Sequence, residues 1–264
     1  MPLVYDAILP HVPVFMMVLA RIGGLFIFAP ALGSPAIPMQ IKALMIIAMT
    51  IVVYPTIDLH AEVPLTLDLM SLAPAMAIES LIGLSIGMIA SLPLVSVQMG
   101  GLLMGQQMGL GLGSIYNPAI DSEADVAGQM LFYLALGIFL IGGGLEAMQR
   151  AMVVSFDAVP IGGMTADDVP LDLVAGMLAA GFELAVRVAA PVLCIIFVET
   201  VATGLIMKTA PQINILSFGF PVRILLGMAA LYASLAAVNE IIGEDVEGSF
   251  RTMLEWVVSI GGRA

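Results

Sequence analysis

The sequence is poor in charge, and positive charge is the scarcest. Only 11% of the 264 residues are charged, and eight Lys and Arg face twenty Asp and Glu, which gives a formal net charge of −12. This balance argues against a basic patch that binds nucleic acid or anionic lipid. Soluble domains carry about 25% charged residues, so the chain departs from that class as well.

Cysteine and histidine are nearly absent. Cys194 is the one cysteine and lies in an apolar run, so no internal disulfide is expected. With His11 and His60 as the two histidines, we expect no metal-ligand cluster, no metal and no cofactor. The G-x-S-x-G pattern at 83–87 lies in a helical apolar run with no histidine after it, so we take it as chance. No P-loop or dinucleotide fingerprint is present either. We therefore predict that the protein is not an enzyme.

The sequence is instead rich in apolar residues. They make up 61% of the chain, with 20 Met and 27 Gly. Such a composition predicts an all-α integral membrane protein. No basic region precedes the first apolar run, so we expect no cleavable signal and expect that run to remain in the mature protein.

Six apolar blocks are about long enough to cross a membrane, since a spanning helix needs about 20 residues. We expect all of them to be helical, because the alternation typical of membrane barrels does not recur. The third and fifth blocks exceed one span, which predicts tilt, bending or projection from the bilayer. The blocks are 12–30, 41–57, 70–97, 127–148, 174–207 and 213–239.

The charged connections do not fit a plain up-and-down bundle. Lys42, Lys208 and Arg223 mark connections expected to be cytoplasmic, but alternation then puts the acidic connection 98–126, with no basic residue, on the same side. We therefore predict helical segments arranged as bent hairpins.

We expect one membrane domain over 1–240 and an amphipathic helical tail over 241–264, where apolar residues recur at helical spacing. An Ala-Pro, proline and base pattern recurs in the two parts of the chain. It suggests a weak repeat of 1–150 and 151–240, or chance among 16 prolines.

Several charged residues lie within apolar blocks, where a charge near the bilayer centre costs at least about 2.5 kcal/mol. One interpretation is an ion or proton path. We favour the other, in which they are structural charges or contacts between subunits. Glu183 and Arg187 are four residues apart in the order that favours a pair on one helix face. The residues are Arg21, Glu79, Glu183, Arg187, Glu199 and Arg223.

The stretch 100–118 repeats glycine every four residues, at Gly101, Gly105, Gly109 and Gly113. Glycines at this spacing let two helix backbones meet. However, each glycine costs a helix about 1 kcal/mol, and the later glycines are two apart, which no helix face uses. We predict a closely packed helix through about Gln107 that breaks from Gly109. An ordinary interhelical loop is the alternative.

Four stretches together resemble a known family. The first is Arg21 followed by Pro30, Pro35 and Pro38, and the second is GQQMGLGLGSIYNP at 105–118. The third is SFDAVPIG at 155–162, and the fourth is 189–227, which contains the motifs APQIN and P-x-R. The sequence is similar over essentially its whole length to the FliR family of the flagellar type III export gate, homologous to the T subunit of virulence injectisomes. Two departures are Asn117, where the family often has Asp, and 144–145, where it often has a histidine.

The resemblance implies a flagellar export-gate subunit of the bacterial inner membrane, in the flagellar basal body. It implies a single copy in a hetero-oligomer with P-type, Q-type and B-type subunits, forming the entry pore for unfolded rod, hook and filament proteins. It also implies that the stretch after the third block plugs the closed pore. Within this stretch we expect the two methionines to form an apolar seal, because methionine adapts to many side-chain shapes, and the three glycines 109, 111 and 113 to provide a hinge. The expected plug residues are Met104, Gly105, Gln106, Gln107, Met108, Gly109, Leu110, Gly111, Leu112, Gly113, Ser114, Ile115, Tyr116, Asn117 and Pro118. The expected subunit-contact or structural charges are Arg21, Glu183, Arg187, Glu199, Lys208 and Arg223.

Three alternatives remain. The first is the same role in an injectisome, and the second is a secondary transporter of a small solute. The third is a membrane-embedded hydrolase, which would have to use Ser85 without a base.

Overall fold

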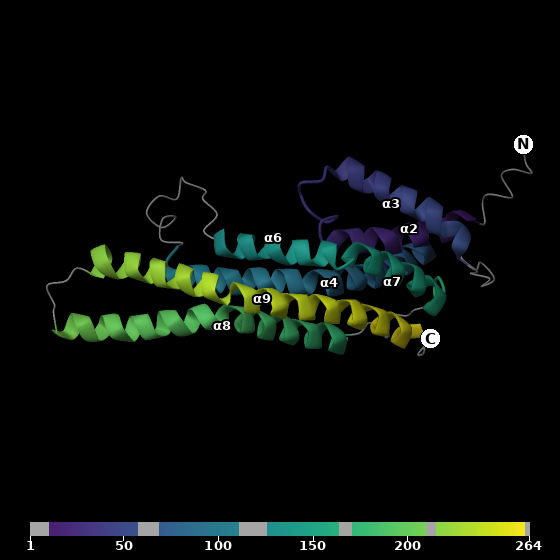
Figure 1. Ribbon diagram of the computed structural model, residues 1–264. Coiled ribbons are helices and arrows are strands. Elements are labelled where there is room, and N and C mark those ends of the chain that lie inside the picture. Colours follow the sequence, from purple (N-terminus) through teal and green to yellow (C-terminus); the bar gives the residue numbers. More distant parts are fainter. Residues whose placement is uncertain (1–10, 58–68, 111–125, 164–170, 210–214, 262–264) are drawn as a thin grey trace, which may run out of the picture. The chain divides into compact units, whose positions relative to one another are not determined.

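The computed structural model describes residues 11–57, 69–110, 126–163, 171–209 and 215–261, and they form helices with no strand among them (Figure 1). The all-α class expected from the composition is confirmed. The elements are α2 (His11–Phe28), α3 (Met39–Val53), η1 (Tyr54–Thr56), α4 (Leu69–Met108), α6 (Val126–Ile141), α7 (Gly144–Ala158), α8 (Leu171–Thr209) and α9 (Ile215–Gly261).

Five helices in the described part of the chain are long and apolar enough to cross a membrane, or six if α6 and α7 form one broken span. This confirms the integral membrane class. The fourth predicted block is not one straight helix, because α6 and α7 are bent by 63° at a short break. Gly143 at this break has φ +80°, a conformation that glycine adopts without strain.

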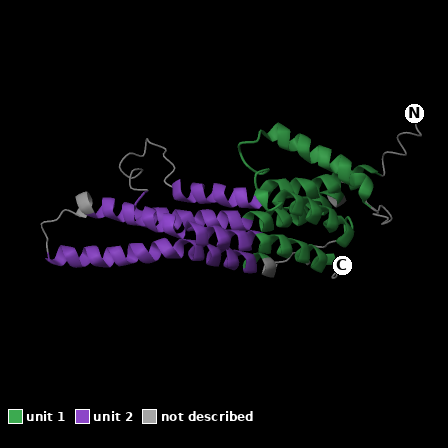
Figure 2. Cartoon of the chain, viewed as in Figure 1, with its two compact units in different colours: residues 1–91, 140–175, 247–264 green, residues 92–139, 176–246 purple. Residues whose placement is uncertain are grey.

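The chain divides into two compact units (Figure 2). Unit 1 consists of 1–91, 140–175 and 247–264, and unit 2 consists of 92–139 and 176–246. α4, α8 and α9 each contribute to both units. The expected amphipathic tail is helical to Gly261 and continues α9 without a break. The expected repeat of 1–150 and 151–240 stays a prediction.

In unit 1, α2 crosses the first half of α4 with the two backbones in close approach. A Cβ placed on Gly83 of α4 would overlap the carbonyl oxygen of Arg21, and one on Gly24 of α2 would overlap the carbonyl oxygen of Ser80. Helices meet this closely only where small residues face each other. Fully buried side chains around this crossing include Met17, Ile22, Leu25, Ile82 and Ile86.

In unit 2, the second half of α4 packs against α6 and α8. The buried residues from these three helices form its core. Fully or almost fully buried apolar residues include Leu94, Val97, Leu131, Ala135, Val188 and Val192.

Large apolar side chains also remain exposed on several helices. α3 is the clearest case, since only 11% of its candidate span is buried. Exposed apolar faces of this extent are typical of surfaces that meet lipid or other helices. Examples are Leu44, Ile51, Val52, Phe197, Val198, Leu205, Leu225 and Tyr232.

Candidate functional site

The described part of the predicted plug is the end of α4. The helix continues through Met108, and Gly109 then takes φ +81°. The Leu110 N–H donates to the Gly105 carbonyl at 3.0 Å, and the Gly109 N–H donates to the Gln106 carbonyl at 3.1 Å. These two bonds form a Schellman motif, in which a left-handed glycine ends a helix. The predicted helix end near Gln107 and break at Gly109 are confirmed, while 111–118 lie outside the described residues.

The glycines before this break lie against neighbouring backbone. A Cβ placed on Gly101 would lie 2.5 Å from the Gly128 Cα of α6, and one on Gly105 would lie 3.6 Å from the Ala127 Cβ. Gly100 lies in the same way against the Ala185 carbonyl of α8. The close packing predicted for the first part of the stretch is therefore confirmed. It also brings the end of α4 beside the start of α6.

Replacing Gly101 with alanine is expected to destabilise the protein by about 1–3 kcal/mol, because the new methyl group overlaps Gly128 backbone that cannot move freely. The matched control is Gly137→Ala in α6, where a Cβ meets nothing within 4 Å. Alanine is a better helix former by about 1 kcal/mol, so the control is expected to be neutral or stabilising. Thermal unfolding followed by circular dichroism in detergent measures both. Equal effects of the two substitutions would contradict the close crossing.

The two methionines expected to seal a pore are both buried within unit 2. Met104 and Met108 are each 0% exposed, while Gln106 and Gln107 between them are exposed. A seal formed by these methionines would require them to leave this packing. That role stays a prediction.

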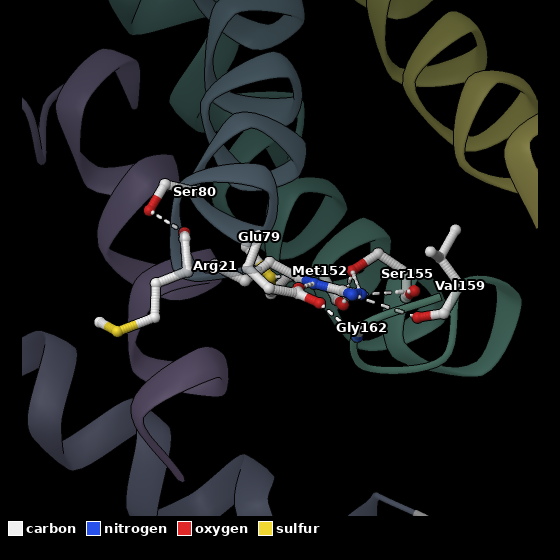
Figure 3. Close-up of polar contacts among 8 residues, drawn as sticks. Arg21, Glu79, Ser80, Met152, Ser155, Val159 and Gly162 are labelled. Carbon is white, nitrogen blue, oxygen red and sulfur yellow. Dashed lines mark hydrogen bonds and ion pairs between the residues drawn. The ribbon is translucent and has the colours of Figure 1, made fainter. Parts of the chain in front are cut away.

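A buried ion pair lies in unit 1, at the crossing of α2 and α4 (Figure 3). Arg21 and Glu79 have side chains 0% and 1% exposed, and the Arg21 Nε donates to the Glu79 Oε2 at 2.5 Å. The Arg21 guanidinium also lies over the Phe156 ring, 4.4 Å from its centroid. A buried charge is tolerated where it is paired and fully hydrogen-bonded.

The same two side chains complete the end of α7 and the turn that follows it (Figure 3). Arg21 Nη1 donates to the Ser155 carbonyl at 2.7 Å, and Nη2 donates to the Val159 carbonyl at 3.1 Å. The Glu79 Oε1 accepts the Gly162 N–H at 2.9 Å. A cation near a helix C-terminus can hydrogen-bond the last carbonyls and interacts favourably with the helix dipole. The sequence placed both charges in apolar runs but did not pair them.

A second ion pair joins α8 and α9 in unit 2. The Arg223 Nε donates to the Glu199 Oε2 at 3.0 Å, and Nη2 donates to the Thr200 hydroxyl at 2.8 Å. The Thr203 hydroxyl donates to the other Glu199 oxygen at 2.7 Å. The Glu199 side chain is 4% exposed and that of Arg223 is 27% exposed. These two predicted charges therefore meet each other.

The pair predicted between Glu183 and Arg187 is wrong. Within the described residues the two side chains form no ion pair or hydrogen bond, and both are exposed. Arg187 lies close enough to Asp245 of α9 for their charges to interact. Asp245 is likewise close enough to Glu183 for the two charges to interact. Lys208 is exposed in the last turn of α8.

The described residues contain no group of three or more His, Cys, Asp or Glu side chains that could bind a metal.

Comparison with known proteins gives consistent matches. The sequence model of the bacterial export proteins, family 1, matches residues 12–248. The flagellar biosynthetic protein FliR of Bacillus subtilis is 23% identical over 259 residues, covering 97% of this chain and 99% of its own. FliR of Caulobacter vibrioides is 27% identical over 228 residues, which are 86% of this chain and 90% of the length of that relative. The secretion system apparatus protein SsaT of Salmonella typhimurium is 27% identical over 157 residues, which are 59% of this chain and 61% of the length of that relative.

Proposed function

Because this chain belongs to the bacterial export proteins, family 1, we propose that it is an export-gate subunit of the flagellar type III secretion apparatus. The observation that carries the proposal is the family match over residues 12–248, which includes nearly every described helix. The apolar helices support a place in a membrane, which we assign to the bacterial inner membrane at the flagellar basal body.

The flagellar role is favoured over the injectisome role by the extent of the matches. The Bacillus subtilis flagellar relative covers 97% of this chain, whereas the Yop proteins translocation protein T of Yersinia pestis covers 79% and the Salmonella secretion-system relative covers 59%. The injectisome role is the second candidate, since the two kinds of relative belong to the same class of export apparatus. In either case the subunit is a conduit component and not an enzyme.

The proposed partners are P-type, Q-type and B-type gate subunits, with this chain in a single copy. The support is the exposed apolar surface of α3, α8 and α9, which is of the kind that meets lipid or other helices. The proposed cargo is unfolded rod, hook and filament protein.

We assign the pore plug to residues 104–118. The support is the packing of the described residues on either side of 111–125, because a Cβ placed on Gly105 of α4 would lie 3.6 Å from the Ala127 Cβ at the start of α6. The connection after Gly109 thus leaves and rejoins the helices at one place in unit 2. Irregular backbone at membrane depth is tolerated only inside protein or beside a water-filled cavity.

Deleting the gene in its flagellated host is expected to abolish swimming and the export of hook and filament protein, because the gate is incomplete without its single-copy subunit. Motility in soft agar and immunoblots of the culture medium measure this, with plasmid complementation as the control. The tagged subunit is also expected to co-purify with P- and Q-type partners.

Different results identify the competing functions. Unchanged motility with loss of secreted effector proteins would transfer the role to an injectisome. Solute uptake by the chain alone in liposomes, with no partner bound, would overturn the gate in favour of a secondary transporter.

A further inference from the structure

Met108, the last residue of α4, lies against bare backbone of α9. A Cβ placed on Gly227 would overlap the Met108 Cγ and Sδ atoms and would lie 3.4 Å from the Ile196 Cδ1 of α8. Met108 is 0% exposed. The Gly227 backbone and the Ile196 side chain therefore form a notch, here called the Met108 notch, and glycine at 227 leaves the space for the methionine.

The Met108 notch is flanked by the ion pair that joins α8 and α9. Arg223 is four residues before Gly227, and Glu199 is three residues after Ile196. Residues three or four apart are neighbours on a helix face. The pair and its threonine partners thus fix α8 against α9 one turn from the notch.

The last turn of α4 is stabilised by its two cap hydrogen bonds, by the packing of Gly105 beside Ala127 and by Met108. Gly109 ends the helix with a left-handed conformation, and the side chains of Gln106 and Gln107 are exposed. Helical turns in proteins are stabilised mainly by packing of their buried face. In this turn Met108 provides the large apolar side chain of the buried face, and the Met108 notch receives it.

We propose that Met108 is a positioning residue: its contact with Gly227 fixes the last turn of α4 and thereby sets the resting permeability of the gate. This inference rests on the proposed function for its consequence at the pore. The contact itself is independent of that function. A bulkier residue at 227 displaces the methionine, and a shorter residue at 108 leaves the notch partly empty.

Thiol labelling tests the contact. The background is Cys194→Ala, because Cys194 is exposed and is the one native cysteine. Leu110→Cys then reports on the turn, as Leu110 is half-buried directly after Gly109. In assembled complexes in native membranes, Gly227→Ala and Met108→Ala are each expected to raise the labelling rate about three-fold or more.

The matched control is Gly204→Ala in α8, where a new Cβ meets nothing within 4 Å. It is expected to leave the labelling rate unchanged. Met108→Ala removes atoms and introduces no overlap, so it remains decisive if Gly227→Ala does not assemble. Unchanged labelling in Met108→Ala would overturn the proposed contact.

The double variant Met108→Ala with Gly227→Ala separates a direct contact from two independent effects. The methyl group introduced at position 227 then fills part of the space that the methionine side chain has left. The labelling rate is expected to lie about three-fold or more below the product of the two single effects, since residues in contact couple. Independent, multiplicative effects would contradict the inference.

Ion leakage in the same membranes separates this inference from the proposed function. Faster labelling together with leakage supports both. Faster labelling without leakage would retain the contact but overturn its role in setting the resting permeability of the gate, and the plug would then be tested by its own deletion. Leakage in Gly227→Ala at an unchanged labelling rate would overturn the positioning role of Met108 and leave the plug standing.

Discussion

Replacing Glu79 with alanine is expected to destabilise unit 1 by about 3–5 kcal/mol, because it leaves the buried Arg21 charge without a counter-charge. It also removes the acceptor of the Gly162 N–H. The expected fall in the unfolding midpoint is about 6–20 °C. The fluorescence of Trp256 during thermal unfolding measures this fall. Trp256 is the one tryptophan, is buried, and lies in a segment of unit 1.

The matched control is Glu146→Ala, an exposed acid of α7 in the same unit, which is expected to shift the midpoint little. The double variant Arg21→Met with Glu79→Leu is expected to be more stable than Glu79→Ala, because an apolar pair replaces both charges and leaves neither alone. If Glu79→Ala were no more destabilising than Glu146→Ala, the paired charge would not be the stabilising contact that its geometry indicates.

Deleting residues 110–115 is expected to make the assembled gate leaky, because the proposed plug then lacks the residues that would fill the pore. Ion conductance of membranes that contain the complex, without export substrate, is expected to rise from background to a steady flux. The measurement uses purified complex in planar bilayers.

A deletion of the same length in the connection 62–67 serves as the control, and it is expected to leave conductance at background. Both variants must retain their P- and Q-type partners on purification. Background conductance in a fully assembled 110–115 deletion would contradict the plug.

The fold class could be predicted because it depends on composition and local pattern. Apolar runs of span length predict membrane helices wherever they occur, since lipid offers no partner for backbone groups. The end of α4 could be predicted for the same kind of reason. Glycines two apart disfavour a helix, and Gly109 alone supplies the left-handed conformation that ends it.

The bend between α6 and α7 was missed, although a signal was present. Three consecutive glycines, 142–144, interrupt the fourth apolar block. Hydropathy does not register them, because glycine is nearly neutral on such a scale. The backbone nevertheless turns at Gly143, which has φ +80°.

For the charged residues too, part could be predicted from the sequence and part could not. The sequence identified Arg21, Glu199 and Arg223 as costly in an apolar setting, which follows from the chemistry of each residue. The sequence favoured Glu183, four residues away, as the partner of Arg187. The reason is that a sequence shows the spacing of residues along one helix but not which residues of other helices lie nearby. In the structure, both Arg187 and Glu183 lie close enough to Asp245 of another helix for their charges to interact with it.

By itself, the sequence determined that this is a helical membrane protein, which stretches of it are apolar enough to form its helices, and which of its residues are costly to bury. Only the tertiary structure decided the partners. Arg21 meets Glu79, 58 residues away, and the carbonyls of Ser155 and Val159, 134 and 138 residues away. Met108 likewise meets Gly227, although α6, α7 and α8 lie between them in the sequence. Such contacts depend on how the helices cross, and the crossing depends on small residues on the facing surfaces of two helices. The pattern of residues along one chain does not show which of these surfaces face each other.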